Sequence, residues 1–600
     1  MQTRREHLAT LLGLGGLTIN CGYFAGVFNG AQREREEMGV KRYEILVDEF
    51  HSLMSSDPLR LVEREDFSRA SELPDVSKEE IERNAARMIS LADKIRASDH
   101  SGASFDQRLD LELAENWLRV KALEVTLPVD ETPKYAVYPN PLVDLLALTP
   151  LYLERDPRAK GKIVDDLISR LGHIGLYLDQ TLARMDRPVA VWVKRDLDAG
   201  KDFDGLAEGV RKFAVSIGYD HMASLGETLG SAKAVVTSYM ARLDAMPKRT
   251  VLSVGERNTE KIFRLKGVDI PLGELHRLAI EYLQGNFAEL GSLRPKLIAK
   301  HGLDPRLDVI GVANELKVRF ASPQGGVVDL ANKLLRQSEA FVYEHGLVRK
   351  IDNQSSRVER AADYLKPIVP IAAIIPPGMF GRGERKSTFY VNEFPGIERG
   401  LNRLNLPAIT AHELVPGHHY QLTRATEHPS KVRAWIEPMD LVEGWAVRVA
   451  EQIMVGEIGY VGDPKLKTEE HYMAKVDQLR IGARVCFVLA LMTGDRKYFE
   501  NPLGVKASAP DMLDAATEFY RGVTGFVEAR ARGDTEVFSS LGTYGALYLV
   551  GSNMLKDMES QGRRKHGDIF SRPKFLESVL QEGMMPLSYV KRSLEHRRII

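Results

Sequence analysis

The sequence is poor in cysteine and has no excess of either charge. Cys21 and Cys486 are the two cysteines of the 600 residues, which excludes a disulfide framework and a cysteine-rich zinc module. The 82 basic and 83 acidic residues give a net charge of −1, so binding to the phosphates of nucleic acids is not expected to be the main activity. Since 44% of the residues are hydrophobic, wholesale disorder is also excluded. Any metal site must therefore use histidine, aspartate and glutamate.

A long uncharged stretch occurs at the N-terminus. Residues 8–28 carry no charge and follow Arg4 and Arg5, an arrangement typical of an export signal. The stretch is also long enough for a membrane anchor, although its five glycines weaken that interpretation, and a merely buried or disordered terminus is a further alternative. We expect residues 1–31 to be an export signal or anchor. The protein would then be exported, periplasmic or envelope-associated, with Cys21 as a candidate lipoprotein cysteine and membrane contact only through this segment if it is retained.

The sequence predicts that the rest of the chain is mainly helical. Apolar residues recur at helical spacing over 109–125, 275–290 and, more loosely, 334–347. Strand-like runs are few, and the best candidates are residues 189–193 and 388–391. The fold class predicted from these patterns is mainly α with one small sheet.

Proline and glycine at 370–383 divide the chain into two portions. Residues 32–375 form a helical N-terminal portion. Residues 376–600 form the portion that contains the candidate metal site. We expect the two portions to form one continuous fold.

Three histidines fall within eight residues, at His412, His418 and His419, and Glu413 follows the first. Zinc favours such imidazole and carboxylate ligands, and a hydrolytic zinc site also needs a general base. On an unbroken helix, however, residues six or seven apart are too far apart along the axis to bind one ion. The Pro-Gly pair within 414–417 predicts a break that folds the chain back and brings His418 or His419 near His412.

A third ligand is predicted further along the chain. Glu443 lies 25 residues after His418, in a stretch with helical character that contains the sequence Glu-Gly-Trp-Ala. Three protein ligands and an open position suit zinc better than magnesium. We therefore predict one zinc ion per chain, held by His412, His418 and Glu443.

The two motifs at 412–421 and 443–451 resemble the HExxPGHHxQ and EGWAxxxAE signatures of a bacterial metallopeptidase-like family of unknown function. That family is distantly similar to zinc peptidases such as thimet oligopeptidase and Taq carboxypeptidase. The resemblance implies a large helical fold with a deep cleft and a small sheet. The chain departs from the family pattern at Val488, Met492 and 542–544, which puts a substrate preference carried over from relatives in doubt.

The residues and the resemblance together predict zinc-dependent hydrolysis of peptide bonds in short peptides. Glu413 is predicted to be the general base that acts on the metal-bound water. His419 either exchanges with His418 as a ligand or donates to the developing oxyanion. Tyr548 is predicted to be an oxyanion donor, with an ordinary core tyrosine as the alternative. Residues 388–392 are a candidate for a cleft-edge strand that pairs with a peptide substrate, and the alternative, an ordinary strand of the small sheet, is compatible with it.

Two other functions compete with the peptidase. One is a non-catalytic member of the family that keeps the fold to bind a peptide or a protein, and the other is an amidase that acts on a non-peptide substrate. The presence of Glu413 beside the predicted ligands favours an enzyme, because a binding protein needs no general base there. Both exopeptidase and endopeptidase action stay open, and no oligomeric state is predicted.

Overall fold

The computed structural model of the protein describes residues 39–600 except 323–325, 366–368, 370 and 394–399. The predicted export segment and Cys21 therefore lie outside the described residues. Within the described ranges, no helix combines the length and the apolar character needed to cross a bilayer. The structure is mainly helical with one small three-stranded sheet, which confirms the predicted fold class.

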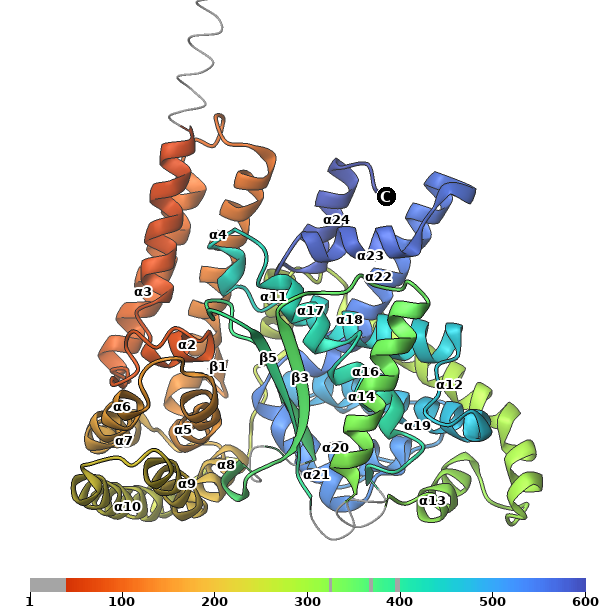
Figure 1. Cartoon of the computed structure of the whole chain (residues 1–600), viewed down its shortest axis with the longest axis horizontal. Coiled ribbons are helices and arrows are strands. Elements are labelled where there is room, and N and C mark those ends of the chain that lie inside the picture. The colour runs from red at the N-terminus through yellow and green to blue at the C-terminus, as the bar shows by residue number, and fades with distance from the viewer. Residues whose placement is uncertain (1–38, 323–325, 366–368, 370, 394–399) are drawn as a thin grey trace, which may run out of the picture.

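The described chain starts with long helices that pack side by side. Residues 39–54 are helical, and three labelled helices follow: α2 (Pro58–Glu63), α3 (Lys78–Ala97) and α4 (Phe105–Thr126). The start of α4 is fixed by a capping box, in which Ser104 and Gln107 each bind the other's backbone N–H. Figure 1 shows α3 and α4 standing together at one side of the molecule. A short hairpin follows, formed by β1 (Pro128–Val129) and β2 (Thr132–Pro133).

Six helices then pack around a core of their own: α5 (Pro141–Pro150), α6 (Lys160–Gly172), α7 (Ile174–Arg184), α8 (Ala190–Lys201), α9 (Phe203–Ser216) and α10 (Met222–Ala245). The prediction of a strand over residues 189–193 was wrong. Val189 makes a single bridge to Arg249, and the rest of the run starts α8. A short apolar run suits a buried helix as well as a strand, and the burial of Trp192, Asp196 and Ala199 follows helical spacing.

Four helices complete the part of the chain before the sheet: α11 (Glu256–Leu265), α12 (Leu272–His301), α13 (Val309–Arg319) and α14 (Val327–Glu344). The apolar face of α12 packs along α19 (Lys467–Thr493), and Leu275, Leu283 and Leu290 share one core with residues of that helix. This core joins residues from both sides of position 376.

The three-stranded sheet has the order β3-β5-β4 and consists of β3 (Gln354–Arg360), β4 (Ala372–Ile375) and β5 (Arg385–Val391). The central strand, β5, pairs in parallel with β3 and antiparallel with β4. The prediction of a strand over 388–391 is confirmed. The interpretation of this strand as a cleft edge that pairs with a peptide is wrong, because both of its edges are already occupied.

The two faces of the sheet pack against different helices. Phe389 and Val391 of β5 lie in a core with residues of α14 and with Leu406 and Leu414, whereas Tyr390 packs against the α5–α10 group. This alternation is the two-residue period of a strand. The sheet therefore lies between the N-terminal helices and the segment that carries the histidines (Figure 1).

The helices after the sheet form the remaining part of the molecule: α16 (Leu406–Glu413), α17 (His418–Ala425), α18 (Met439–Trp445), the π-helix η5 (Ala446–Ile458), α20 (Met512–Thr524), α21 (Glu528–Ser540), α22 (Tyr544–His566), α23 (Arg572–Gln581) and α24 (Leu587–His596). Short turns of π-helix or 3-10 helix connect the main elements: η1 (Lys134–Ala136), η2 (Leu151–Arg155), η3 (Asp363–Leu365), η4 (Arg433–Trp435), η6 (Pro464–Leu466), η7 (Arg496–Phe499) and η8 (Gly567–Ile569).

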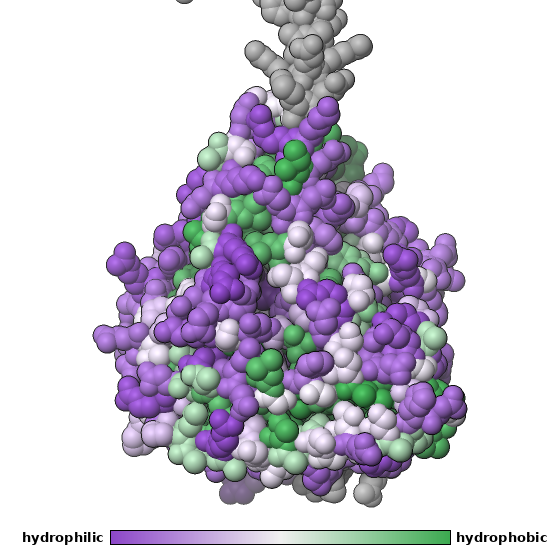
Figure 2. All heavy atoms as spheres, turned by 90° about the vertical axis from the view of Figure 1, so that its left-hand side faces the viewer, coloured by the Kyte–Doolittle hydropathy of each residue, from purple (hydrophilic) through white to green (hydrophobic). Residues whose placement is uncertain are grey.

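The face formed by the N-terminal helices is mostly hydrophilic (Figure 2). Its hydrophobic side chains form several separate groups rather than one broad area. Isolated surface groups of this kind are normal for a folded protein and do not mark a binding surface.

Candidate metal centre

A sharp reversal of the chain between α16 and α17 brings the histidines together. Helix α16 ends at Glu413 and α17 begins at His418, as the Pro-Gly pair predicts. The N–H of Gly417 donates to the carbonyl of Ala411 at 3.0 Å, so the chain turns back onto the helix it has just left. A Cβ atom at Gly417 would lie 1.7 Å from the carbonyl oxygen of His412, so glycine is required by this close approach.

The reversal is held from a second helix. The indole N–H of Trp445, at the end of α18, donates to the carbonyl of Pro416 at 2.8 Å. Trp445 is fully buried, which fixes the orientation of its indole ring. The Glu-Gly-Trp-Ala motif thus positions the turn between the two histidine-bearing helices.

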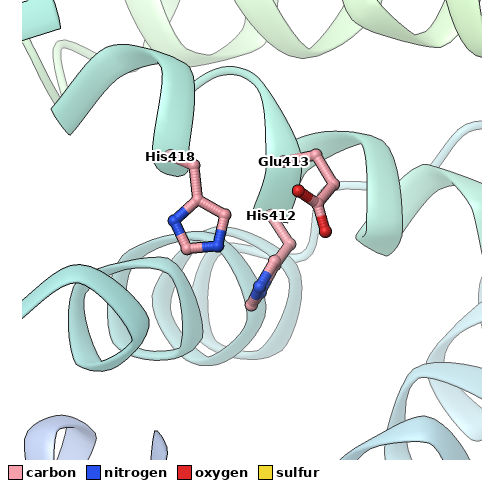
Figure 3. Close-up of side chains that lie close together, drawn as sticks. All are labelled: His412, Glu413 and His418. Atoms are coloured by element: carbon pink, nitrogen blue, oxygen red, sulfur yellow. The ribbon is translucent and has the colours of Figure 1, made fainter. Parts of the chain in front are cut away.

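His412 and His418 face each other across the reversal. Their ring centroids lie 4.8 Å apart with the ring planes nearly perpendicular. One ligand atom from each of His412, Glu413 and His418 falls within 4.8 Å of the others. All three side chains project to the same side of α16 and α17 (Figure 3).

Glu443 of α18 completes the group. Its Oε2 lies 3.7 Å from Nε2 of His412 and 3.5 Å from Nε2 of His418. Ligands at about 2.0–2.1 Å from a tetrahedral zinc ion are about 3.3 Å apart, so these separations fit one ion with little adjustment. Glu443 is 3% exposed, and its Oε2 is a buried oxygen without a hydrogen-bond partner among the described residues. The donor set therefore fits zinc.

A close contact between two helices places Glu443. Helices α18 and α22 approach so closely that a Cβ atom on Gly551 would lie 1.8 Å from the carbonyl oxygen of Asp440. Gly444, next to Glu443, meets Gly551 at the same contact. As a result Tyr544, at the start of α22, reaches Glu443 and donates its hydroxyl hydrogen to Oε1. Oε2 is left facing the two imidazole rings.

A second carboxylate, that of Glu451, lies next to the other ring nitrogen of His412. Oε1 of Glu451, in the π-helix η5, lies 2.9 Å from Nδ1 of His412 and also receives a hydrogen bond from Arg480. Burial would lower the pKa of His412, but Glu443 and Glu451 outweigh it and raise the pKa to about 9. Despite burial, Arg480 and His412 lower the pKa of Glu451 to about 2. A carboxylate in this position orients a metal-binding histidine and fixes which ring nitrogen faces the metal.

The structure does not bring His419 into this group. Nδ1 of His419 lies 2.7 Å from the hydroxyl of Ser387 on β5, and Nε2 lies 2.5 Å from Oε1 of Gln354 on β3. Both ring nitrogens are therefore engaged with the sheet. Burial lowers the pKa of His419 to about 3, so the ring is neutral. His419 connects α17 to the sheet, and it neither faces Glu443 nor contacts His412.

A cavity of about 210 Å³ adjoins the histidines. His412, Glu413 and Tyr548 line it, together with polar residues of α19 and α21. Burial and the nearby charge of Glu443 raise the pKa of Tyr548 well above its ordinary value, so its hydroxyl keeps its hydrogen. The guanidinium of Arg484 lies 5.0 Å from the centre of its ring. Tyr548 is thus a buried tyrosine that also lines the cavity, and its role as an oxyanion donor stays a prediction.

Sequence reasoning missed Tyr544 and gave no role to Glu451. Both left a signal in the sequence. Tyr544 precedes Tyr548 by four residues, which places the two phenols on one face of α22. Glu451 is an acidic residue in a largely apolar helical stretch, where a buried charge needs a partner.

Fold and site together define a mainly helical protein in which two histidines and two glutamates converge beside a cavity. The chain belongs to the family described as "Bacterial protein of unknown function (DUF885)", whose model matches residues 61–594. A comparison with curated proteins gives no significant match.

Two solved structures share this fold. One is described as "the putative lipoprotein from Colwellia psychrerythraea"; it is 14% identical, has a TM-score of 0.75, and the match covers 92% of this chain and 99% of that one. The other is described as "a putative lipoprotein of unknown function from Shewanella oneidensis"; it is 16% identical, has a TM-score of 0.70 and shows the same coverage. At this identity the likeness establishes the fold alone.

Proposed function

We propose that the protein is a zinc-dependent hydrolase that cleaves peptide bonds in short peptides. The observation that carries the proposal is that Oε2 of Glu443 lies 3.5–3.7 Å from Nε2 of both His412 and His418, beside the carboxylate of Glu413. Two histidines and a glutamate are the protein ligands of a large class of zinc hydrolases. The adjoining cavity gives a substrate access to the same group.

The proposed chemistry divides among a few residues of the chain. When bound, zinc lowers the pKa of a water molecule and polarises the carbonyl of the bond to be cleaved. Glu413 takes the proton from the attacking water and later delivers it to the leaving amine. Tyr548 donates a hydrogen bond to the oxygen that gains negative charge. Glu451 and Tyr544 hold His412 and Glu443 in position.

The proposal is tested by digesting a peptide library with the zinc-loaded protein and identifying the products by mass spectrometry. We expect one zinc ion per chain and cleavage that stops when the metal is removed and returns when zinc is added. Glu413→Gln is the matched control, because it removes the base and keeps the side-chain size. Full activity in metal-free protein contradicts the proposal. Zinc and peptide binding without turnover would instead indicate a binding protein, and cleavage restricted to non-peptide amides would indicate an amidase.

We also propose that the protein is exported to the cell envelope. Two solved structures with the same fold are described as putative lipoproteins, which supports this proposal. The uncharged residues 8–28 and Cys21 also support it. The test is expression of the full chain and of Cys21→Ser with metabolic labelling by a fatty acid, followed by cell fractionation. Label on the wild type that disappears in the variant is expected. Unlabelled protein in the cytoplasm contradicts the proposal.

A further inference from the structure

One buried carboxyl group near the candidate metal centre has no hydrogen-bond partner among the residues that the structure describes. Asp477 lies in the middle of α19 and is 5% exposed. Neither of its carboxylate oxygens has a hydrogen-bond partner among the residues that the structure describes. Asp477 is a wall residue of the cavity that His412 and Glu413 also line. A buried carboxylate left without a partner is costly, so its presence beside a candidate active site points to a ligand.

Arg480 and Arg484, which line this cavity, make no direct hydrogen bond to the carboxylate of Asp477. Arg480 donates one hydrogen bond to the side chain of Glu451 and another to the backbone carbonyl of Asp477, not to its carboxylate. Arg484 pairs with Asp534 at 3.3 Å. The cavity wall therefore holds two arginines that donate to other carboxylates, and an aspartate whose carboxylate oxygens accept no hydrogen bond from the described residues, although the charge of Arg480 acts on it.

Two further cations lie in this region. Arg530, which also lines the cavity, has its guanidinium 3.5 Å from the centre of the Phe526 ring. Lys317 on α13 is close enough for its charge and that of Asp477 to influence each other. Neither makes an ion pair within 4 Å of Asp477 in the described structure. The carboxylate thus keeps its full capacity to accept hydrogen bonds.

Asp477 lies one turn before a residue of α19 that is linked to the candidate metal centre. Arg480 links α19 to Glu451 and through it to His412. Asp477 precedes Arg480 by three residues, so their Cα atoms are about 4.5 Å apart along the helix axis. Asp477, His412 and Glu413 line the same cavity, so a group bound at Asp477 belongs to a substrate that occupies this cavity.

We propose that Asp477 binds an ammonium group of the substrate, either the free α-amino terminus of a short peptide or the side chain of a lysine. The inference rests on the proposed function and names the substrate class of that site. An ammonium group offers three hydrogen-bond donors, and an ionised carboxylate accepts several. Charge-assisted hydrogen bonds are about twice as strong as neutral ones, and exclusion of water from the cavity strengthens them further. The small volume of the cavity favours recognition of a chain end.

The experiment compares matched peptides. A pooled library of tripeptides and tetrapeptides is prepared with free and with acetylated N-termini, and each lysine peptide is paired with its norleucine analogue. We expect the wild type to cleave one cationic form with a kcat/KM roughly tenfold or more above that of its neutral partner, mainly through KM. Discrimination against acetylation identifies the α-amino group, and discrimination against norleucine identifies the lysine side chain.

The variants assign the preference to Asp477. Asp477→Asn should reduce the ratio between the matched peptides to about one, whereas Asp477→Glu, which restores the charge, should recover part of it. Glu500→Gln, which removes an exposed carboxylate just beyond the end of α19, is the control and should leave the ratio unchanged. Equal cleavage of the matched peptides by the wild type overturns the inference even if an Asp477 variant does not fold, and it leaves the proposed hydrolysis intact.

A binding measurement separates this inference from the proposed function. Calorimetric titration of the metal-loaded Glu413→Gln variant with the same matched peptides reports recognition without turnover. Preferential binding of the cationic peptides by this variant, together with no cleavage of any peptide by the wild type, supports the role of Asp477 and contradicts the hydrolase. Binding without preference contradicts the role of Asp477.

Discussion

Tyr544 donates its phenolic hydrogen to Oε1 of Glu443, whose Oε2 faces Nε2 of both His412 and His418. The phenol therefore holds the carboxylate so that one oxygen is directed at the two histidines. The contact joins the first turn of α22 to α18, at the place where Gly444 and Gly551 let the two helices touch. Positioning of this kind reduces the rotational freedom that a ligand loses when it binds a metal.

We predict that Tyr544→Phe weakens zinc binding without removing it. The substitution keeps the ring and deletes only the hydroxyl, so Glu443 stays in place and loses the hydrogen bond that orients it. Loss of such a supporting contact typically costs 10–100-fold in metal affinity or activity, and we expect about tenfold in affinity. Competition with a chromophoric chelator gives the zinc Kd. An unchanged Kd would show that the hydrogen bond does not contribute to the metal site.

Tyr548→Phe is predicted to lower turnover without weakening zinc binding. Tyr548 lies one turn further along α22 and lines the cavity with Glu413. The hydroxyl of Tyr548 is proposed to donate a hydrogen bond to the oxyanion. Its removal should therefore lower kcat about 10²-fold or more and leave the zinc Kd near that of the wild type. Steady-state kinetics and the chelator competition are measured on the same protein. A normal kcat would return Tyr548 to the role of a core tyrosine.

Glu413→Gln is predicted to keep the metal and lose turnover. Glutamine matches glutamate in size but cannot accept a proton from water, so kcat should fall by at least about 10²-fold. The measurement is kcat on a peptide selected from the library, with zinc content determined by elemental analysis. Turnover at the wild-type rate would show that another group is the base.

Local sequence patterns predicted the part of the site that depends on neighbouring residues. The break at 414–417 follows from Pro416 and Gly417, although the reversal that returns His418 to His412 is also held by the distant Trp445. The apolar spacing over 275–290 corresponds to one face of α12. These features could be predicted because their causes lie within a few residues of the effect.

Features that depend on distant segments could not be predicted. The strand at 388–391 was recognised, but its central place in the sheet is set by β3 and β4, which the sequence does not link to it. The engagement of His419 depends on Gln354, 65 residues earlier, and Tyr544 reaches Glu443 from 101 residues away. The prediction of a strand over 189–193 was wrong for another reason: five apolar residues suit a buried helix as well as a strand.

The two adjacent histidines are predicted to differ in metal binding. His418→Ala should lose zinc, because it removes one of the two rings that face Glu443. His419→Ala should keep most of the zinc, because the ring of His419 is bound to Ser387 and Gln354. We expect His419→Ala to lower turnover, since α17 loses its attachment to the sheet. Zinc content per chain of the two variants decides the question, and the reverse pattern would assign the ligand role to His419.

The last prediction concerns Asp440, which lies at the start of α18, close to the metal centre. Asp440 is 2% exposed, and its Oδ2 accepts a hydrogen bond from the backbone N–H of Leu587 at 2.7 Å. Burial raises the pKa of Asp440 from 3.8 to about 7, against the effect of that hydrogen bond. In the folded protein the carboxyl group therefore keeps its proton to near neutral pH, whereas in the unfolded chain it loses the proton near pH 4.

The sign of the effect on stability follows from this difference. Between about pH 4 and pH 7 the folded state binds more protons than the unfolded state, so this group contributes most to stability below pH 4 and loses its contribution as the pH rises to 7. Asp440→Asn does not titrate. Relative to the wild type, the variant should therefore become more stable as the pH rises from 5 to 8, by on the order of 1–3 kcal/mol. Urea unfolding of metal-free protein at pH 5, 6 and 8 measures this change, with Asp557→Asn, an exposed carboxylate of α22, as the control. If the free energies of unfolding of wild type and Asp440→Asn differ by the same amount at all three pH values, Asp440 is already ionised in the folded protein and the hydrogen bond from Leu587 outweighs its burial.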